Sequence, residues 1–416
     1  MKAIVGTAAN NTHLHQIGQA LEESGSLLRF IVPFAGFPLG NPRLFARRMP
    51  AGIPPSKILH FPAGEILRIA AAKLGMPDTW VDRLWERGEL EFDRACAKVV
   101  ARENPDVYLG VEHAALFALR ESRNRGVAAG LIFTSLHHRF RERWLAPELQ
   151  RFPQLLSSSA RRIRERDGAR DARRDEEIGT ADFLHANSLV TARSLEEAGV
   201  PADRILTVPL GSPPAVPDSE LPLAPPASPV LLFVGNVAVH KGAHHLLEAW
   251  AKLGARKGAR LDLYGSWALP REFHPAAGSG VFEHGRVPRD VVLSAMRRAS
   301  ALVLPSICDG FGMVAAEAMA QGIPVICSAN AGASQLVVEG VNGFVVPPAD
   351  PDRLAERMGW CIDNPEQLHA MGRKAAQTAR DWSWAHFRRS FAAGLAQMLV
   401  HIGHPPAPGA KGPPSP

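Results

Sequence analysis

This chain of 416 residues lacks several sequence features, and their absence excludes whole classes of protein. No apolar run approaches the roughly 20 residues that a membrane-spanning helix needs. The first residues pass from a short apolar stretch into a polar turn, without the apolar core of a signal peptide. The four cysteines, Cys96, Cys308, Cys327 and Cys361, have neither metal-ligand nor redox spacing. We therefore expect buried or free reduced thiols and a cytoplasmic protein.

Charge of one sign is not in large excess either. The chain has 47 Lys and Arg against 41 Asp and Glu, a formal net charge of +6. The basic residues are not interleaved with aromatic ones and no nucleic-acid-reading motif is present, so nucleic acid is not an expected partner. Arginines cluster at 43–48, 139–143 and 161–166. The run that starts at residue 161 also carries acidic residues, which is typical of a solvated helix with internal ion pairs.

The order of apolar runs predicts an α/β protein with two domains. Short apolar runs alternate with helical stretches, as in parallel sheets with helical crossovers. Strands are predicted at 2–5, 28–32, 107–109, 129–134, 183–186 and 205–208, and again at 230–234, 261–264, 301–304, 324–327 and 343–346. Prolines crowd residues 209–229, too densely for a helix or a central strand. The predicted organisation is an N-terminal domain at 1–208, a hinge at 209–229, a C-terminal domain at 230–385 and a disordered tail at 403–416.

The most informative motif follows the predicted strand at 301–304. Pro305 leads into a glycine-flanked turn with Asp309, and a helical run with Glu317 comes next. Strand, glycine turn and helix N-terminus make an anion cradle, because glycine permits close approach and the first N–H groups of a helix are free. Two carboxylates beside such a cradle suggest the hydroxyl groups of a nucleotide sugar. The alternative is that Asp309 caps the helix and Glu317 lies on its solvated face.

The spacing of these two carboxylates excludes one chemistry. Eight residues along a helix separate them by about 12 Å. The paired carboxyl groups of a glycoside hydrolase lie about 5–10 Å apart. A hydrolase pair is therefore not expected.

The segment 304–325 resembles the E-x7-E signature of retaining glycosyltransferases with the GT-B fold, in particular glycosyltransferase family 4. Residues 232–249 resemble the strand-loop-helix that opens the family's C-terminal domain, 181–211 the end of its N-terminal domain, and 340–350 the tail of its nucleotide site. The resemblance covers about 104–389 and is weak over the first hundred residues. It implies two Rossmann-like domains facing across a cleft, and a helix at 386–402 that packs back on the N-terminal domain. It also implies a nucleotide diphosphate sugar as co-substrate, with no cofactor and no metal.

The resemblance assigns roles to single residues. Lys241 would neutralise the leaving diphosphate, but its usual arginine companion is Asn236 here, so one phosphate-directed charge is missing. Asp309 would bind hydroxyls of the donor sugar. It replaces the family's glutamate and is shorter by one methylene, roughly 1.5 Å. Glu317 would bind the ribose.

Further contacts are implied around these residues. Of two adjacent histidines after the predicted strand at 129–134, one would face the donor sugar across the cleft, and His137 is favoured over His138. Phe311 could line the sugar or pack in the core. The remaining donor contacts would come from the base loop and the glycine turn: Arg286, Val287, Gly310, Phe311, Gly312, Met313 and Val314.

Together these features predict a retaining glycosyltransferase of polysaccharide or glycoconjugate synthesis. The acceptor could be a glycan, a lipid-linked sugar or a small molecule. The resemblance also implies peripheral contact with the inner face of a membrane, since enzymes of this fold that glycosylate lipid-linked acceptors often meet it through basic N-terminal surface. Asn236 and Asp309 leave one alternative open, a catalytically weak homologue that acts as a nucleotide-sugar-binding module.

Overall fold

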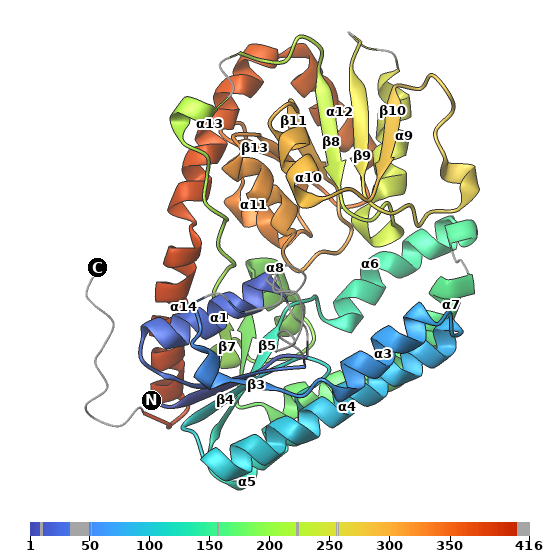
Figure 1. Cartoon of the computed structure of the whole chain (residues 1–416). Helices are drawn as coiled ribbons and strands as arrows, with labels where there is room; N and C mark the ends of the chain where they lie inside the picture. Colours follow the sequence, from blue (N-terminus) through green and yellow to red (C-terminus); the bar gives the residue numbers. More distant parts are fainter. Residues whose placement is uncertain are drawn as a thin grey trace.

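The computed structural model of the chain describes residues 1–8, 11–33, 50, 52–155, 158–221, 224–254, 256 and 258–405, without the side chains of 158–167 (Figure 1). The arginine cluster at 43–48 and most of the predicted disordered tail lie outside these residues. The four cysteines are free and buried, as expected. No helix in the described ranges is long and apolar enough to cross a membrane.

The N-terminal domain is built on a seven-stranded sheet in the order β3-β2-β1-β4-β5-β6-β7, and every neighbouring pair is parallel. The strands are β1 (Ala3–Gly6), β2 (Leu27–Val32), β3 (Ile58–His60), β4 (Val107–Val111), β5 (Ala128–Phe133), β6 (Phe183–Ala186) and β7 (Ile205–Thr207). Strands β1, β4, β5 and β6 are buried throughout, because helices cover both faces of such a sheet. The six predicted strands are confirmed within one or two residues, and β3 was not predicted.

Helices surround this sheet (Figure 1). They are α1 (Thr12–Glu23), α3 (Ala63–Lys73), α4 (Asp78–Glu103), α5 (Leu116–Asn124), α6 (His138–Arg151), α7 (Ser158–Thr180) and α8 (Leu189–Glu196). Helices α3 and α4 form a hairpin between β3 and β4, where the sequence predicted only amphipathic stretches. Helix α6 reaches from the end of β5 toward the other domain.

The C-terminal domain has a second parallel sheet, in the order β10-β9-β8-β11-β12-β13. Its strands are β8 (Val230–Val234), β9 (Arg260–Tyr264), β10 (Val281–Gly285), β11 (Ala301–Leu304), β12 (Val325–Ser328) and β13 (Gly343–Val346). Its helices are α9 (Ala243–Leu253), α10 (Arg289–Met296), α11 (Met313–Ala320), α12 (Pro351–Asp363) and α13 (Pro365–Asp381). The predicted strands are again confirmed, and the edge strand β10 was not predicted. Both domains are therefore doubly wound α/β units, as expected.

The chain crosses between the domains twice, and the two crossings lie side by side. The N–H of Ser212 donates to the carbonyl of Trp382 at 2.6 Å, and the N–H of Trp384 donates to the carbonyl of Ser212 at 3.3 Å. A side chain on Gly211 would lie 2.8 Å from the backbone of Ser383 and Trp384, so only glycine fits this approach. The described part of the proline-rich segment holds no α-helix, only the 3₁₀ turn Asp218–Glu220.

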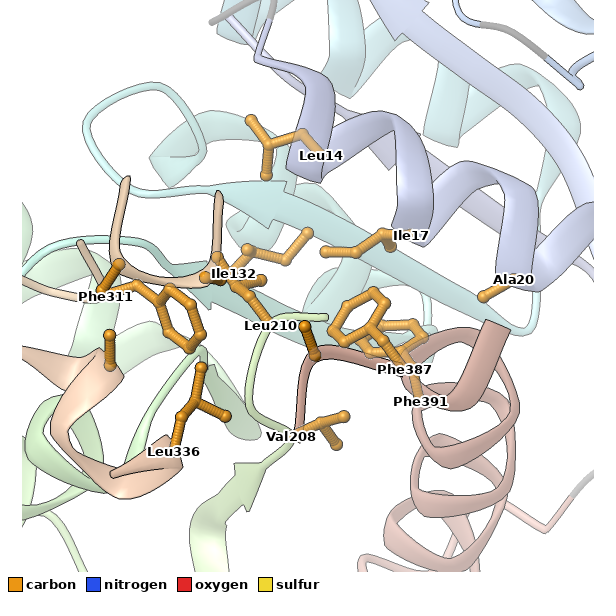
Figure 2. Close-up of a cluster of buried hydrophobic side chains, with 14 of the residues drawn as sticks. Leu14, Ile17, Ala20, Ile132, Val208, Leu210, Phe311, Leu336, Phe387 and Phe391 are labelled. Carbon is orange, nitrogen blue, oxygen red and sulfur yellow. The ribbon is translucent and has the colours of Figure 1, made fainter. Parts of the chain in front are cut away.

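After the second crossing, α14 (Trp384–His401) packs on α1 of the N-terminal domain (Figure 1). Phe387 and Phe391 are buried in one cluster with Leu14 and Ile17 (Figure 2). The same cluster includes Phe311, which follows β11 in the other domain. One continuous apolar core therefore joins the two domains and holds the carboxyl ends of their sheets close together.

Candidate active site

Two loops of the C-terminal domain form one surface at the carboxyl ends of β8 and β11. The carbonyl of His240 accepts hydrogen bonds from the N–H groups of Ile307 (3.0 Å) and Cys308 (3.2 Å). Gly242, where α9 starts, has a φ of 67°. A side chain there would overlap the carbonyl oxygen of Pro305. The glycine in this motif is thus explained by the close approach of α9 to the end of β11.

Lys241 and Asp309 meet on this surface. The Lys241 Nζ donates to Asp309 Oδ2 at 2.5 Å, and the two side chains are 23% and 13% exposed. An ammonium group has three donors and a carboxylate has two oxygens. The pair therefore leaves donors on Lys241 and one oxygen on Asp309 for a ligand. The alternative that Asp309 caps α11 is wrong, because the cap residue is Gly312 and no side chain caps this helix.

The glycine turn before α11 presents free backbone donors. Gly312 has a φ of 83°, the left-handed region that favours glycine. None of the described residues accepts a hydrogen bond from the N–H groups of Gly310, Phe311, Gly312, Met313 or Val314. Such a run of unpaired N–H groups at a helix N-terminus attracts anions. This is the geometry that the sequence predicted for an anion cradle.

Glu317 lies on α11, beyond the cradle, and its side chain is partly buried. Its Oε1 accepts from Arg289 Nη2 at 2.6 Å. Arg289 begins α10, directly after the predicted base loop, in which Arg286 is exposed and Val287 packs against the core. The pair therefore ties the base loop to α11. Sequence reasoning missed Arg289, because its partner is 28 positions away and nothing local marks it.

Phe311 and Asn236 are two further predicted donor contacts. Phe311 is 3% exposed and belongs to the cluster with Ile132, Leu210 and Leu336 (Figure 2). Of the two alternatives left open for this side chain, the structure therefore shows packing in the core. Asn236 is exposed in the loop after β8, where it supplies no positive charge.

The cradle rests directly on the N-terminal domain. A side chain on Gly310 would overlap the carbonyl oxygen of Thr134 and lie 3.1 Å from Ser135. The carbonyl of Gly310 accepts from Ser188 Oγ at 2.6 Å and from Thr191 Oγ1 at 3.2 Å. The carboxyl ends of β5, β6 and β11 thus meet at one point, and the structure is a closed one.

A buried ion pair positions the turn at Thr134 and Ser135. Glu112 accepts from both backbone N–H groups, at 2.9 and 2.8 Å. Arg174 Nη2 donates to Glu112 Oε2 at 2.6 Å and to Ser135 Oγ at 2.8 Å. Burial alone would raise the pKa of Glu112, but Arg174, His113 and the N–H of Thr134 lower it below its usual value.

The position of Arg174 differs from the prediction of a solvated helix. It lies in the run expected to be a solvated helix, and α7 does form there, but the Arg174 and Glu112 side chains are each only 2% exposed. The local spacing of charges could not show this, because Glu112 is 62 positions away. Both residues were missed as parts of the site.

The prediction that His137 faces the donor sugar is wrong. His137 is 2% exposed and caps α6, its Nδ1 accepting from the N–H of Arg139 at 3.2 Å. Its Nε2 lies 3.3 Å from Asp175, and burial lowers its pKa to about 4. The ring of His138 packs on it at 4.3 Å and also contacts Asp175. The two rings are therefore neighbours, since they stand at a helix start and not on a strand.

Two groups of described residues bring possible metal ligands within 4.8 Å of one another: His137 with His138 and Asp175, and Glu148 with His244 and His245. In the second group, Glu148 Oε2 lies 2.9 and 2.7 Å from the two Nε2 atoms. These contacts join α6 of the N-terminal domain to α9 beside Lys241. Neither group includes a residue of the cradle, and a metal-independent site stays a prediction.

Two doubly wound sheets with facing carboxyl ends and a returning C-terminal helix define the GT-B fold. Solved structures with that fold align over nearly the whole chain. The Anabaena protein Alr3699/HepE, in complex with UDP, has a TM-score of 0.63 and 17% identity over 95% of this chain and 100% of its own. Sucrose-phosphate synthase from Thermosynechococcus elongatus has a TM-score of 0.62 and 18% identity over 97% and 99%. These likenesses establish the fold.

Residues 220–378 match the family model described as "Glycosyl transferases group 1", and they include Lys241, Asp309 and Glu317. The D-inositol 3-phosphate glycosyltransferase of Nocardia farcinica is 29% identical over 272 residues, which cover 59% of this chain and 60% of that protein. Its counterpart in Streptomyces griseus is 39% identical over 101 residues, covering 24% and 21%. The matched stretch thus spans less than two thirds of each relative. The family model lies almost wholly within the C-terminal domain.

Proposed function

We propose that the protein is a retaining glycosyltransferase that moves a sugar from a nucleotide diphosphate sugar to an acceptor. The observation that carries this proposal is the placement of Lys241, Asp309 and the N–H groups of 310–314, which no described residue accepts from, at the ends of β8 and β11. The UDP complex of the Anabaena neighbour supports a nucleotide ligand in such a fold. The group 1 match over the same residues supports sugar transfer.

In this proposal the leaving group is the diphosphate. Lys241 and the N–H groups of the cradle stabilise the negative charge that develops on it as the sugar bond breaks. Asp309 holds a sugar hydroxyl, Glu317 holds the ribose, and the backbone of Arg286 and Val287 contacts the base. Catalysis then depends on positioning and leaving-group stabilisation. The lysine and the helix N-terminus supply the positive charge that a metal or cofactor would otherwise supply.

Arg141 is our candidate for the phosphate-directed charge that Asn236 lacks. It lies on α6, and its carbonyl oxygen is 4.0 Å from the Cys308 sulfur. Cys308 directly precedes Asp309. Burial raises the pKa of Cys308 to about 12, and the nearby charge of Arg141 opposes that rise. Arg141 therefore approaches the donor loop from the opposite domain.

A cytoplasmic protein at the inner face of a membrane, acting in polysaccharide or glycoconjugate synthesis, fits this proposal. The basic surface that would touch the membrane includes Arg139 and Arg143. Arg139 forms an ion pair with Asp175, and Arg143 forms one with Glu197. Turnover of any donor would dismiss the alternative of a binding module. Thermal stabilisation by UDP-, GDP- and ADP-sugars would identify the donor, because a ligand of the folded state raises stability by mass action.

The division of roles between Asp309 and Glu317 tests the proposal by calorimetry. Glu317→Ala is expected to weaken binding of the free nucleotide by about 1–3 kcal/mol, because the ribose loses its acceptor. Asp309→Ala is expected to leave binding of the free nucleotide unchanged and to weaken only binding of the nucleotide sugar. Glu356→Ala is the matched control, since it breaks an exposed pair with Arg353 on α12.

Equal loss of free nucleotide in the Asp309 and Glu317 variants would refute this division. A similar loss in the Glu356 variant would show that the effect is not local to the site. The ion pair of Glu317 with Arg289 needs its own control. Arg289→Ala removes that pair but keeps the carboxylate, so it should retain most of the nucleotide affinity.

A further inference from the structure

A buried cluster of three side chains joins the two domains outside the cradle. Glu148, near the end of α6 in the N-terminal domain, meets His244 and His245 at the start of α9 in the C-terminal domain. The three residues are only 6%, 3% and 1% exposed. His244 follows Lys241 by three positions, but none of the three has a part in the donor site proposed above.

The charge of Glu148 is not balanced by a lysine or an arginine. Among the described residues, its ion-pair partners are the two histidines. Burial would raise the pKa of Glu148, but hydrogen bonds from His244 and His245 lower it to about 2. Burial lowers the pKa of His244. Near pH 7 the cluster thus combines an ionised carboxylate with a neutral imidazole, and these are the protonation states that bind metal ions.

Three atoms of the cluster converge as the ligands of a metal ion do. Glu148 Oε2 lies 2.9 Å from His244 Nε2 and 2.7 Å from His245 Nε2, and the three atoms are all within 4.8 Å of one another. Two ligands of a tetrahedral zinc ion, each about 2.0–2.1 Å from the metal, lie about 3.3 Å apart. A spread of about half an ångström would therefore admit the ion and leave its fourth position for water.

The other ring nitrogens fit the same interpretation. The Nδ1 atoms of His244 and His245 are buried, and none of the described residues forms a hydrogen bond with them. A ring that donates from Nε2 to Glu148 leaves Nδ1 bare, whereas a ring that ligates through Nε2 carries its proton on Nδ1. Glu248 Oε2 lies 3.9 Å from His245 Nδ1. A carboxylate in this place is a common outer partner of a metal-bound histidine.

The surroundings of the cluster are apolar. The Phe152 ring meets both imidazoles edge-on, at centroid distances of 5.5 and 6.5 Å, and the Phe273 ring lies 6.4 Å from His244. Phe152 follows α6 and packs against the core of the C-terminal domain. An apolar shell limits the access of solvent, and attraction between charges is stronger inside it.

We propose that Glu148, His244 and His245 form a binding site for a zinc-class transition metal ion, which ties α6 to α9 in the closed arrangement. Two imidazoles and one carboxylate suit Zn²⁺, whereas Mg²⁺ and Ca²⁺ prefer oxygen ligands alone. The carboxylate comes from one domain and the imidazoles from the other, so closure completes the site and opening admits the ion. The ion has no part in the transfer chemistry proposed above, and it opposes the opening that donor exchange requires.

Isothermal titration calorimetry of the metal-stripped full chain with ZnCl₂ tests the site. We expect Glu148→Gln and His245→Gln each to weaken binding of one ion by about tenfold or more, and MgCl₂ not to bind there. Glutamine keeps the shape of glutamate, and circular dichroism verifies that each variant folds. His138→Gln is the matched control, because His138 belongs to the other described group of possible ligands. It should keep the ion that the two cluster variants lose.

X-ray absorption spectroscopy of the zinc-loaded wild type tests the ligands without a substitution. We expect nitrogen and oxygen ligands with the outer-shell scattering of two imidazole rings, and no sulfur. Sulfur ligation, zinc binding that is lost only in the His138 variant, unchanged binding in both cluster variants, or no zinc binding at all would each overturn the site.

Hydrogen exchange followed by mass spectrometry tests the tie between the domains. Zn²⁺ should slow exchange of the backbone amides of α6 and of the start of α9 severalfold in the wild type, because it opposes local opening. It should leave them unchanged in Glu148→Gln. Helix α5 packs on α4 and α7 and is the internal reference. Zinc that binds without this protection would overturn the tie. None of these measurements uses a nucleotide or a sugar, so their failure leaves the proposed transfer untouched.

Discussion

Replacing Arg174 by methionine is expected to lower the free energy of unfolding by about 3–5 kcal/mol, because it leaves a buried carboxylate without its counter-charge. The two side chains are each 2% exposed, and Glu112 keeps only the hydrogen bonds from Thr134 and Ser135. Methionine keeps most of the side-chain volume, so the loss reports on charge more than on packing. Denaturant unfolding followed by circular dichroism measures it.

Two controls isolate the buried pair. Arg143→Met breaks an exposed pair with Glu197 and should cost less than about 1 kcal/mol. The double variant Arg174→Met/Glu112→Gln should be more stable than Arg174→Met alone, because the amide keeps an acceptor without the charge. A loss below about 1 kcal/mol in Arg174→Met, or no recovery in the double variant, would contradict the role assigned to the pair.

The same pair predicts a dependence of stability on pH. The pKa of Glu112 is lower in the folded chain than in the unfolded one. The ionised Glu112 therefore contributes fully to the free energy of unfolding when the pH is well above its pKa in the unfolded chain, about 4.3. This contribution is lost as the pH falls below that value toward the lower pKa of the folded chain. The Glu112→Gln variant should lose less stability between pH 6 and pH 3 than the wild type.

The second large effect is expected at Lys241. Lys241→Ala should weaken binding of a nucleotide diphosphate by about 1.5–3 kcal/mol, the range of a charge-assisted hydrogen bond. It should also lower turnover, because the leaving diphosphate loses its cation. Isothermal titration calorimetry and initial rates measure the two effects separately.

Lys252→Ala is the matched control for Lys241. Lys252 lies on α9 in exposed pairs with Glu248 and Asp352, so its removal should leave both quantities unchanged. Arg141→Ala should weaken binding of the nucleotide diphosphate by a smaller amount than Lys241→Ala does, if Arg141 supplies the charge that Asn236 lacks. Unchanged binding and rate in Lys241→Ala would remove Lys241 from the site.

Much of the fold could be predicted from the sequence, because buried parallel strands are apolar over their whole length. The predicted strands at 183–186, 230–234, 301–304 and 343–346 have the observed bounds. The two missed strands are both at sheet edges. β3 has three residues, and β10 is exposed along most of its length. Neither has the apolar run that marks a central strand.

The site was predictable where its chemistry is local in the sequence. Lys241, Asp309 and the glycine turn each follow a strand, and the structure brings them together. Residues that act through partners far along the chain were missed, as Arg174 and Arg289 show. The prediction for His137 failed because α6 starts at residue 138, so the histidine became a helix cap with a buried ring. A motif thus located the cradle, but only the fold showed which side chains support it.

The closed arrangement also implies a movement. The carbonyl of Gly310 is held by Ser188 and Thr191, and Glu148 joins α6 to His244 and His245. A donor that enters between the domains must separate these contacts. We therefore expect opening about the two adjacent crossings at Ser212 and Ser383 during each turnover.

The anomeric configuration of the product tests the central claim most directly. The protein is mixed with an α-linked nucleotide diphosphate sugar and an acceptor that it glycosylates, without added divalent metal. Proton NMR of the first-formed product then gives the configuration through the coupling constant of its anomeric proton. We expect an α-linked product, formed equally well with a chelator present. A β-linked product, or activity abolished by the chelator and restored by manganese, would contradict it.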